Sequence, residues 1–583
     1  MRQAIPVFLG LAGIAIMISA CGAPPDYDVI IRGGSVLDGT GAPALVTDVG
    51  IRGDAIATVG DLSASTAAET IDAAGLTVTP GFIDMHSHSD FTLLVDPRAL
   101  SKVMQGVTTE LLGESNSAAP ALGPARPELA RTLDGLELAL DWATLGEYFA
   151  RVERTPPSVN ILSTVASGQI RAAVVGYDNR PATTDELERM TALVDEAMRD
   201  GAAGLSSGLI YPPNSYAPTE ELVALARAAA RHDGIYVSHI RNESDGLLDA
   251  LNEAIRIGRE ADIQVEVLHF KRSGARPVPS GTDVTIQDAA LLIEEAQAAG
   301  IEIYANLYPY AASQTTLNIR LPDWTLEGGR EQLVVRLRDP ETRERIRREV
   351  ADLLVGDRGG ATPATVMVGR TPYEPHRQYQ GMRLAAIAEA MGVEPADALL
   401  EIIDRADGTA GGIFFGMREE DVAFAMALPW TTIGSDGTAL APDGILGRTH
   451  PHPRSYGTFA RVLGHYARDE GVLTLPDAVR KITSLPASRL GLDDRGTLDA
   501  GQRADIVVFD AATVTDTATF GDPQQLATGV RWVIVNGEVV VADGTHTGAT
   551  PGRVLRHAAA GAATDDVQAL RSLFPSRTRP SSG

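Results

Sequence analysis

Strand-like and helical segments alternate through the middle of the chain. Helical stretches such as Thr184–Arg199 and Gln287–Ala299 lie between most of the strand-like ones. This alternation predicts parallel βα units, and eight strands are the number that closes a (β/α)8 barrel. We therefore predict an α/β protein with a (β/α)8 TIM-type barrel at residues 80–494. The candidate strands are Gly81–His88, Gly106–Glu114, Ser158–Ser167, Gly201–Ser207, Gly234–His239, Ile263–His269, Ile301–Asn306 and Trp430–Asp436.

The regions outside this alternation predict three further parts. Short strands with turn signals occupy residues 26–79 and 495–554, and we expect the two ends to pair into one small β-sandwich domain. The gap between Tyr310 and Pro429 is too long for one βα loop, so we expect an inserted lid subdomain at about 314–380. An Ala/Gly/Ser/Arg-rich tail at 555–583 is expected to be flexible.

The first twenty residues have the pattern of an export signal. The apolar run from Ala4 to Ala20 is short for a membrane-spanning helix. It ends in Ile18-Ser19-Ala20-Cys21, which resembles the lipobox of bacterial lipoproteins, and Cys21 is the only cysteine of the chain. We expect residues 1–20 to be a lipoprotein signal peptide and Cys21 to be the lipidation site, with an ordinary signal peptide as the alternative. The exported protein would be anchored in a membrane and face the periplasm or the cell exterior.

Composition excludes several classes of function. The 50 Lys and Arg against 76 Asp and Glu give a formal net charge of −26, and such an acidic surface repels the phosphates of nucleic acids. One cysteine permits neither an intramolecular disulfide nor a thiolate-rich zinc or iron–sulfur site. We therefore expect no nucleic-acid partner, and the oligomeric state stays open.

Four of the eleven histidines fall at the ends of candidate strands. His86 and His88 are two residues apart on the first strand, so their side chains project from the same face. His239 and His269 close two later strands, and Asp436 closes the last. Barrel enzymes keep their active sites at the carboxyl ends of the strands, so we expect these side chains to converge on a divalent metal.

These motifs resemble those of the amidohydrolase superfamily and, within it, the D-aminoacylase (N-acyl-D-amino-acid deacylase) family. The His-x-His motif follows a Gly-Phe-Ile-Asp strand, and further similar stretches cover most of residues 26–554 in order. These stretches are Gln105–Glu110, Gly204–Pro212, His269-Phe270-Lys271, Tyr308-Pro309-Tyr310, Gly434–Gly437 and Pro451–Phe459. The combination is specific for the superfamily and less so for one substrate.

The resemblance implies a metal centre with His86, His88, His239 and His269 as ligands. Family members have a cysteine thiolate at the end of the second strand, where it bridges the metal positions, but this chain has Glu114 there. A carboxylate also bridges two cations and prefers harder ions, so Glu114 is the expected bridge. Zinc, as one or two ions, is the expected metal, and manganese is the alternative.

The resemblance also implies a reaction, the hydrolysis of an N-acyl-D-amino acid to a D-amino acid and a carboxylate. A bound metal activates water and polarises the scissile carbonyl. Asp436 is expected to take the proton of that water and to deliver it to the leaving amine. Lys271 and Arg454 are expected to bind the substrate carboxylate together with a tyrosine, for which Tyr308 is preferred to Tyr310. The D configuration comes from the resemblance alone.

Two other kinds of function stay open at this point. One is a different amidohydrolase, such as a dipeptidase, an imidase or a deaminase, although Lys271 with Arg454 favours a substrate with a free carboxylate. The other is a non-catalytic lipoprotein, which has no use for Asp436 beside four candidate metal ligands. We therefore predict a metal-dependent amidohydrolase that acts on linear amides.

Overall fold

The computed structural model describes residues 24–115, 117–274, 284–355 and 362–557. The predicted signal peptide at 1–20 and Cys21 lie outside the described residues. No helix within them combines the length and the apolar character that a membrane-spanning helix requires.

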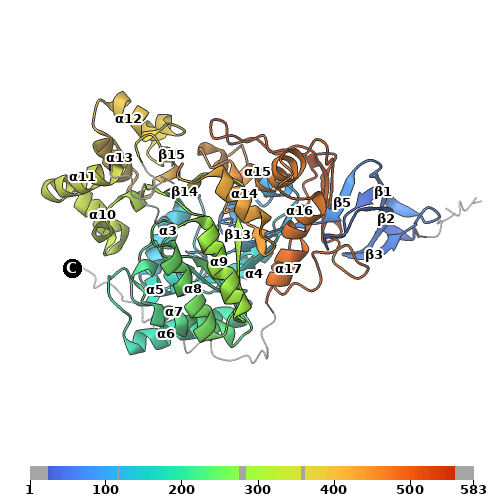
Figure 1. Cartoon of the computed structure of the whole chain (residues 1–583), viewed down its shortest axis with the longest axis horizontal. Coiled ribbons are helices and arrows are strands. Elements are labelled where there is room, and N and C mark those ends of the chain that lie inside the picture. The colour runs from blue at the N-terminus through green and yellow to red at the C-terminus, as the bar shows by residue number, and fades with distance from the viewer. Residues whose placement is uncertain (1–23, 116, 275–283, 356–361, 558–583) are drawn as a thin grey trace, which may run out of the picture.

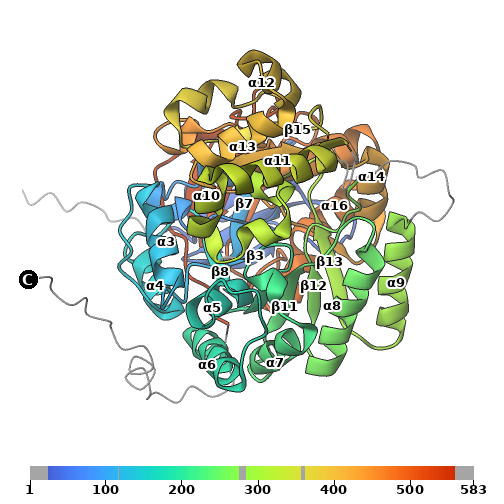
Figure 2. The ribbon, with the colours of Figure 1, turned by 90° about the vertical axis from the view of Figure 1, so that its left-hand side faces the viewer.

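Eight strand positions form a closed parallel barrel (Figure 2). One sheet has the order β17-β13-β12-β11-β10-β9 and the other the order β6-β7-β8. β8 and β9 occupy one position, interrupted at Thr164, and the Ala203 amide donates to the Ser163 carbonyl at 2.9 Å to join the two sheets there. On the other side, the Met85 amide donates to the Ile433 carbonyl at 3.3 Å. The predicted fold class is confirmed.

Each barrel strand overlaps a predicted segment, and β10 and β13 end one residue beyond theirs. The bounds are β6 (Phe82–Asp84), β7 (Val107–Leu112), β8 (Asn160–Ser163), β9 (Val165–Ala166), β10 (Gly204–Gly208), β11 (Ile235–His239), β12 (Val265–Val267), β13 (Ile303–Leu307) and β17 (Thr431–Ile433).

Helices surround the barrel, and α6 (Thr184–Asp200) illustrates why they form. Thr183 and Glu186 make a capping box at its start, and Gly201 ends it with φ 106°, a conformation that suits glycine. Its apolar residues face the barrel wall. The other helices are α1 (Thr92–Val95), α2 (Leu100–Val103), α3 (Ala125–Asp134), α4 (Leu145–Glu153), α5 (Ser167–Val174), α7 (Thr219–Ala230), α8 (Leu247–Ala261), α9 (Ile286–Ala298), α14 (Glu419–Ala427), α15 (Arg454–Arg461), α16 (Leu475–Ile482) and α17 (Ser484–Arg489).

A nine-stranded sheet unites the two ends of the chain (Figure 1). β5 pairs antiparallel with β18, with Val78 opposite Val508, and residues of both halves, such as Ile51 and Ile534, share one apolar core. The strands are β1 (Tyr27–Val36), β2 (Leu45–Arg52), β3 (Ala55–Gly60), β4 (Ala67–Asp72), β5 (Thr77–Pro80), β18 (Ile506–Phe509), β19 (Val530–Val535), β20 (Glu538–Ala542) and β21 (Thr545–His546).

An inserted subdomain with its own sheet and apolar core leaves the barrel after β13. Its sheet has the order β14-β16-β15 and is covered by four helices. The predicted end near residue 380 is too early, because β16 returns to pair with both other strands. The elements are β14 (Ser313–Thr316), α10 (Gly329–Arg338), α11 (Pro340–Val355), β15 (Val366–Arg370), α12 (Leu384–Met391), α13 (Pro395–Arg405) and β16 (Gly411–Phe414).

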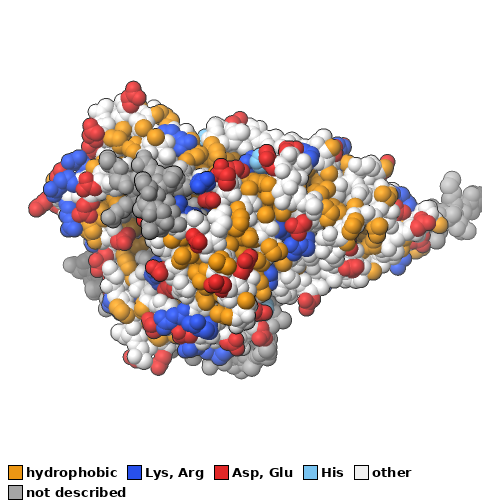
Figure 3. Space-filling view, in the orientation of Figure 1, with side chains coloured by type: hydrophobic (Ala, Val, Ile, Leu, Met, Phe, Trp, Pro, Cys, Tyr) orange, Lys and Arg blue, Asp and Glu red, His pale blue; other side chains and the backbone are white. Residues whose placement is uncertain are grey.

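Charges of both signs alternate on α11, at the outer edge of this subdomain (Figure 3). Arg345 pairs with Glu349 and Arg347 with Glu344, each at 2.8 Å. Such pairs one turn apart support a helix whose surface is mostly polar.

The predicted flexible tail begins too early. The Leu555 amide donates to the Ile161 carbonyl at 2.8 Å, Arg556 pairs with Glu153 at 2.5 Å, and the His557 amide donates to Gly201 at 3.1 Å. These bonds hold 555–557 against the barrel, and the rest of that tail, 558–583, lies outside the described residues.

Candidate active site

The side chains predicted to bind metal meet at the carboxyl ends of the barrel strands. His86 and His88 follow β6, His239 ends β11, and His269 follows β12. Glu114 follows β7. All are buried except His88, which is partly exposed. A parallel barrel brings these strand ends to one mouth, so residues far apart in the sequence become neighbours.

Glu114 lies between the histidines of the first strand and those of the later strands. Its Oε2 is 3.6 Å from His86 Nε2 and 3.3 Å from His88 Nε2. Its Oε1 is 3.8 Å from His239 Nδ1. One carboxylate oxygen therefore faces each side, which is the arrangement that a bridging ligand requires.

Glu243, which sequence reasoning missed, joins the second pair of histidines. His239 Nδ1 and His269 Nε2 are 2.8 Å apart, and Glu243 Oε1 is 2.9 Å from His269 Nδ1. Glu243 Oε2 is 3.9 Å from His239 Nε2. Its only sequence signal is its place four residues after a strand-end histidine, and the neighbouring Asp245 fits such a signal about as well.

The donor set fits a divalent metal. Both ring nitrogens of His86, Glu114 Oε1 and His239 Nε2 are buried without a hydrogen-bond partner, which is rare unless another group completes the site. Three groups of candidate ligands have their atoms within 4.8 Å of one another: His86, His88 and Glu114; His86, His269 and Asp436; and His239, Glu243 and His269. Nitrogen and carboxylate donors of this kind suit zinc.

Electrostatics favours the metal-binding states of His239 and Glu114. Burial, together with the nearby His269, lowers the pKa of His239 to about 3, so the imidazole is neutral. Burial raises the pKa of Glu114, but the nearby imidazoles of His86 and His88 outweigh it and lower that pKa to about 2. A neutral imidazole and an ionised carboxylate are the ligand forms.

Asp436 lies across the site from Glu114 and next to a cation. Its Oδ1 is 3.0 Å from His88 Nε2, and its Oδ2 is 2.8 Å from Arg454 Nη1. Burial opposes ionisation, but the charges of Arg454 and His86 hold the pKa of Asp436 well below its usual range. Asp436 is therefore a carboxylate, with one oxygen toward the candidate metal ligands.

The residues predicted to bind the substrate carboxylate surround one tyrosine. Lys271 Nζ is 5.8 Å and Arg454 Cζ is 4.7 Å from the centre of the Tyr308 ring. Tyr310 instead donates its hydroxyl to Asp516 at 3.3 Å. Of the two tyrosines, Tyr308 therefore accompanies the cationic pair. Lys271 also contacts Glu243 Oε1 at 2.5 Å, so its charge is balanced locally.

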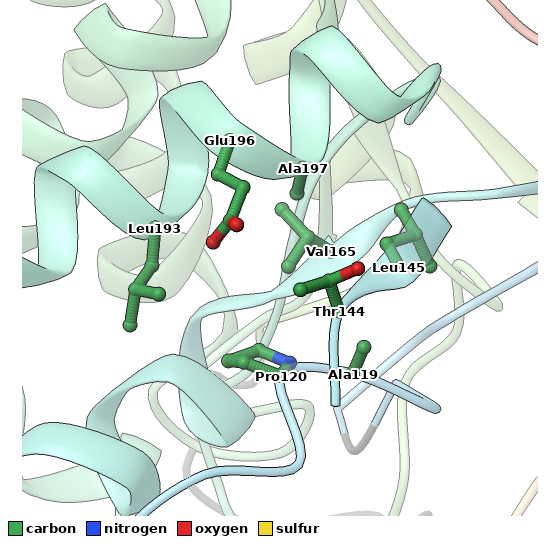
Figure 4. Close-up of a pocket in the computed structure, with 8 residues that line it drawn as sticks. All are labelled: Ala119, Pro120, Thr144, Leu145, Val165, Leu193, Glu196 and Ala197. Carbon is green, nitrogen blue, oxygen red and sulfur yellow. The ribbon is translucent and has the colours of Figure 1, made fainter. Parts of the chain in front are cut away.

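A small cavity in the barrel lies next to two of the candidate ligands. His86 and Glu114 share a small cavity with six residues of the barrel strands and of the loops that follow them: Met85, Leu111, Leu112, Thr164, Val237 and Leu268. A second small pocket, between β9, α6 and the start of α4, contains none of the predicted site residues (Figure 4).

Comparisons with known proteins match most of the chain. The family model described as the amidohydrolase family matches residues 69–541. The D-aminoacylase of Alcaligenes xylosoxydans xylosoxydans is 37% identical over 534 residues, which cover 92% of this chain and 98% of that protein. The N-acyl-D-aspartate deacylase of the same organism is 34% identical, covering 91% of this chain and 96% of that protein.

A solved structure has the same architecture. It is the N-acyl-D-glutamate deacylase of Bordetella bronchiseptica, complexed with zinc and a phosphonate inhibitor that mimics the tetrahedral intermediate. It superposes with a TM-score of 0.75 at 34% identity and covers 91% of this chain and 99% of that one. The chain therefore belongs to the amidohydrolase family, with the D-aminoacylases and N-acyl-D-amino-acid deacylases as its relatives.

Proposed function

We propose that this protein hydrolyses the amide bond of N-acyl-D-amino acids and releases a D-amino acid and a carboxylate. The observation that carries the proposal is that a metal-ligand set, a carboxylate base and a cationic pair share one barrel mouth. Relatives named for D-aminoacylase, N-acyl-D-aspartate deacylase and N-acyl-D-glutamate deacylase activity match nearly the whole length of the chain.

A divalent ion, zinc in the Bordetella relative, supplies the activation of water and the polarisation of the scissile carbonyl when it is bound. The residues that would hold it are His86, His88, Glu114, His239 and His269. The buried, unpartnered atoms of His86, Glu114 and His239 support this assignment. Glu114, with one oxygen toward each pair of histidines, would be able to serve one ion or to bridge two.

Asp436 moves the proton. Its Oδ1 is directed toward the candidate ligands, where it accepts a proton from the attacking water and then gives it to the leaving amine. Arg454 holds the other oxygen at 2.8 Å and thereby fixes the direction of the carboxylate. Arg454 also favours the ionised form of Asp436, so the acceptor is ready before the substrate arrives.

Lys271, Arg454 and Tyr308 bind the free carboxylate of the substrate. Both side chains lie beside Tyr308, where they also pair with Glu243 and Asp436, and ammonium and guanidinium groups are strong donors to a carboxylate. With the carboxylate held here and the acyl carbonyl held among the metal ligands, the α-carbon has one arrangement that leaves room for its side chain. The site therefore selects one enantiomer, and the names of the relatives favour D.

The test compares matched N-acetyl-D-amino and N-acetyl-L-amino acids, with the α-carboxylate free or converted to its amide. We expect kcat/KM to be highest for the free D acid and to fall when the carboxylate is neutralised. A preference for L would overturn the stereochemistry. Equal activity on the neutral amide would overturn the role given to Lys271 and Arg454.

We also propose that the protein is an exported lipoprotein attached through Cys21. The support is the Ile18-Ser19-Ala20-Cys21 motif at the end of an apolar run. In a competent bacterial host, labelled fatty acid should enter the wild-type protein and be absent from Cys21→Ser. A wild-type protein without label would overturn the anchor and leave the catalytic proposal intact.

A further inference from the structure

A buried lysine lies directly behind the candidate active site, between the barrel wall and the surrounding helices. Lys102 belongs to α2 and is fully buried. Its Nζ donates to Asp84 Oδ2 at 2.7 Å and lies 3.4 Å from Glu110 Oε2. Lysine is rarely buried this fully unless it is paired, and the function proposed above uses none of these three residues.

The remaining hydrogen bonds of Lys102 reach both strands that carry the reacting groups. Lys102 Nζ is 3.1 Å from the hydroxyl of Ser87, the residue between the first two candidate ligands. It is 2.8 Å from the hydroxyl of Ser435 and 3.3 Å from the carbonyl of Gly437, the two neighbours of the proposed base. One ammonium group thus joins the segment after β6 to the segment after β17.

Asp84 and Glu110, the two carboxylates beside Lys102, also bond to the segments after β6 and β17. Asp84 Oδ1 accepts the backbone amides of His86 at 3.2 Å and Ser435 at 2.7 Å, and Asp84 Oδ2 accepts the Ser435 hydroxyl at 2.6 Å. Glu110 accepts the hydroxyls of Ser87 and Ser89. The neighbours of the candidate ligands and of the base are therefore linked to one another through Lys102, Asp84 and Glu110.

The bonds made by Lys102 do more than balance the charges of Asp84 and Glu110, because they also hold the backbone on both sides of Asp436. Asp436 has φ 48°, a left-handed conformation that a non-glycine residue keeps only when its surroundings hold it. Its amide donates to the His86 carbonyl at 2.7 Å, and both of its neighbours are bonded to Lys102.

We propose that Lys102 is a positioning residue that sets His86, His88 and Asp436 relative to one another by joining the ends of β6 and β17. The inference rests on the function proposed above, because it assigns those three residues to metal binding and proton transfer.

Lys481 provides a matched control. It is also fully buried, but it donates to the backbone carbonyls of Leu428 and Thr431, at the start of β17 and not at its end. Lys481 belongs to α16, so Lys481→Met removes a buried amino group that contacts the same strand, away from the candidate ligands.

The experiment compares wild type, Lys102→Met and Lys481→Met after loading with Co²⁺, whose visible spectrum reports ligand geometry without any substrate. We expect Lys102→Met to show an altered spectrum, and its Co²⁺ affinity or its kcat to fall by about 10–100-fold, the usual cost of losing a group that orients ligands, while KM stays unchanged. Lys481→Met should keep the wild-type spectrum and kcat. A folded Lys102→Met with the wild-type spectrum and kcat would overturn the proposal.

Ser435→Ala decides the case in which Lys102→Met does not fold. It removes the bonds to Lys102, Asp84 and the Gly437 amide without leaving a charge unpaired. An altered Co²⁺ spectrum with reduced kcat supports the proposal, and an unchanged spectrum and kcat overturn it. If the wild type cleaves no N-acyl-D-amino acid, the proposed function fails, while the spectra still test whether Lys102 positions the ligands.

Discussion

The two ends of the barrel strands differ in what their polar groups do. At the carboxyl ends, left-handed backbone occurs at His269 and Asp436, which themselves carry the chemistry. At the amino ends, left-handed residues such as Asp262 and Gly201 end helices, which is ordinary C-cap geometry. Left-handed backbone thus occurs in the candidate site at one end of the barrel and ends helices at the other.

The five residues of β11 run from the amino end of the barrel to the end that carries the candidate site. Ile235 begins the strand and packs in the apolar interior with residues of α17 and the segment after it, while His239 ends the strand among the candidate ligands. Substitutions along one strand can therefore separate loss of stability from loss of chemistry, and the predictions below use that separation.

Removal of metal should have the largest effect. His239→Ala or treatment with a chelator should take activity to background, because several candidate ligands converge on the same site. Bound zinc, measured by elemental analysis, should fall in parallel, and added zinc should restore the chelated wild type. Full activity of a metal-free preparation would contradict the metal assignment.

Asp436→Asn should lower kcat by about 10²–10⁴-fold, the usual contribution of a positioned acid or base, and should retain metal. Asp443→Asn, at an exposed surface carboxylate, is the control and should leave kcat unchanged. A nearly normal kcat in Asp436→Asn would assign the proton transfer to another group.

Ile235→Ala should destabilise the fold by about 2–5 kcal/mol because it opens a cavity in the interior, with little change in kcat at a temperature where the variant is folded. Chemical denaturation measures the first quantity and steady-state kinetics the second. A large fall in kcat without loss of stability would show that the amino end of β11 affects catalysis directly, which would contradict the separation of the two ends.

Glu266 in β12, between the two ends, should give the smallest effect, one that depends on pH. Burial raises its pKa to about 7, with Asn306 at 3.1 Å as one of its few partners. The folded state binds the proton of Glu266 more tightly than the unfolded state does. The contribution of Glu266 to the free energy of unfolding is therefore full below pH 4.5 and is lost as the pH rises through about 7. Glu266→Gln should therefore gain about 1–3 kcal/mol relative to wild type at pH 8, and much less at pH 4.5. Equal differences at both pH values would contradict the raised pKa.

The barrel and most of the site are predictable from the sequence because both depend on local patterns. Alternating segments predict the strands, and a histidine or aspartate at a strand end has its position fixed by the barrel. Glu243 and Lys102 could not be predicted in this way. Glu243 reaches His269 from the loop after β11, and Lys102 reaches the ends of β6 and β17 from α2, and no spacing in the sequence indicates either contact.

The choice between Tyr308 and Tyr310 shows the same limit. The two residues stand two apart, and only the structure shows that one faces Arg454 while the other bonds to Asp516. The end of the inserted subdomain was misplaced for a similar reason, since β16 belongs to it through antiparallel pairing with β14 and β15.

The pairing of β5 with β18 has a consequence for the order of folding. During synthesis the amino-terminal strands emerge first, and β5 can pair with β1 at once. The other edge of β5 has no partner until β18, near the end of the chain, has been made. An unpaired edge of this kind favours association between chains, and a contact so distant in sequence forms slowly. Completion of this sheet is therefore expected late in folding, after the barrel has brought the two ends together, and a chain that stops before β18 should aggregate even though it contains every residue of the candidate site.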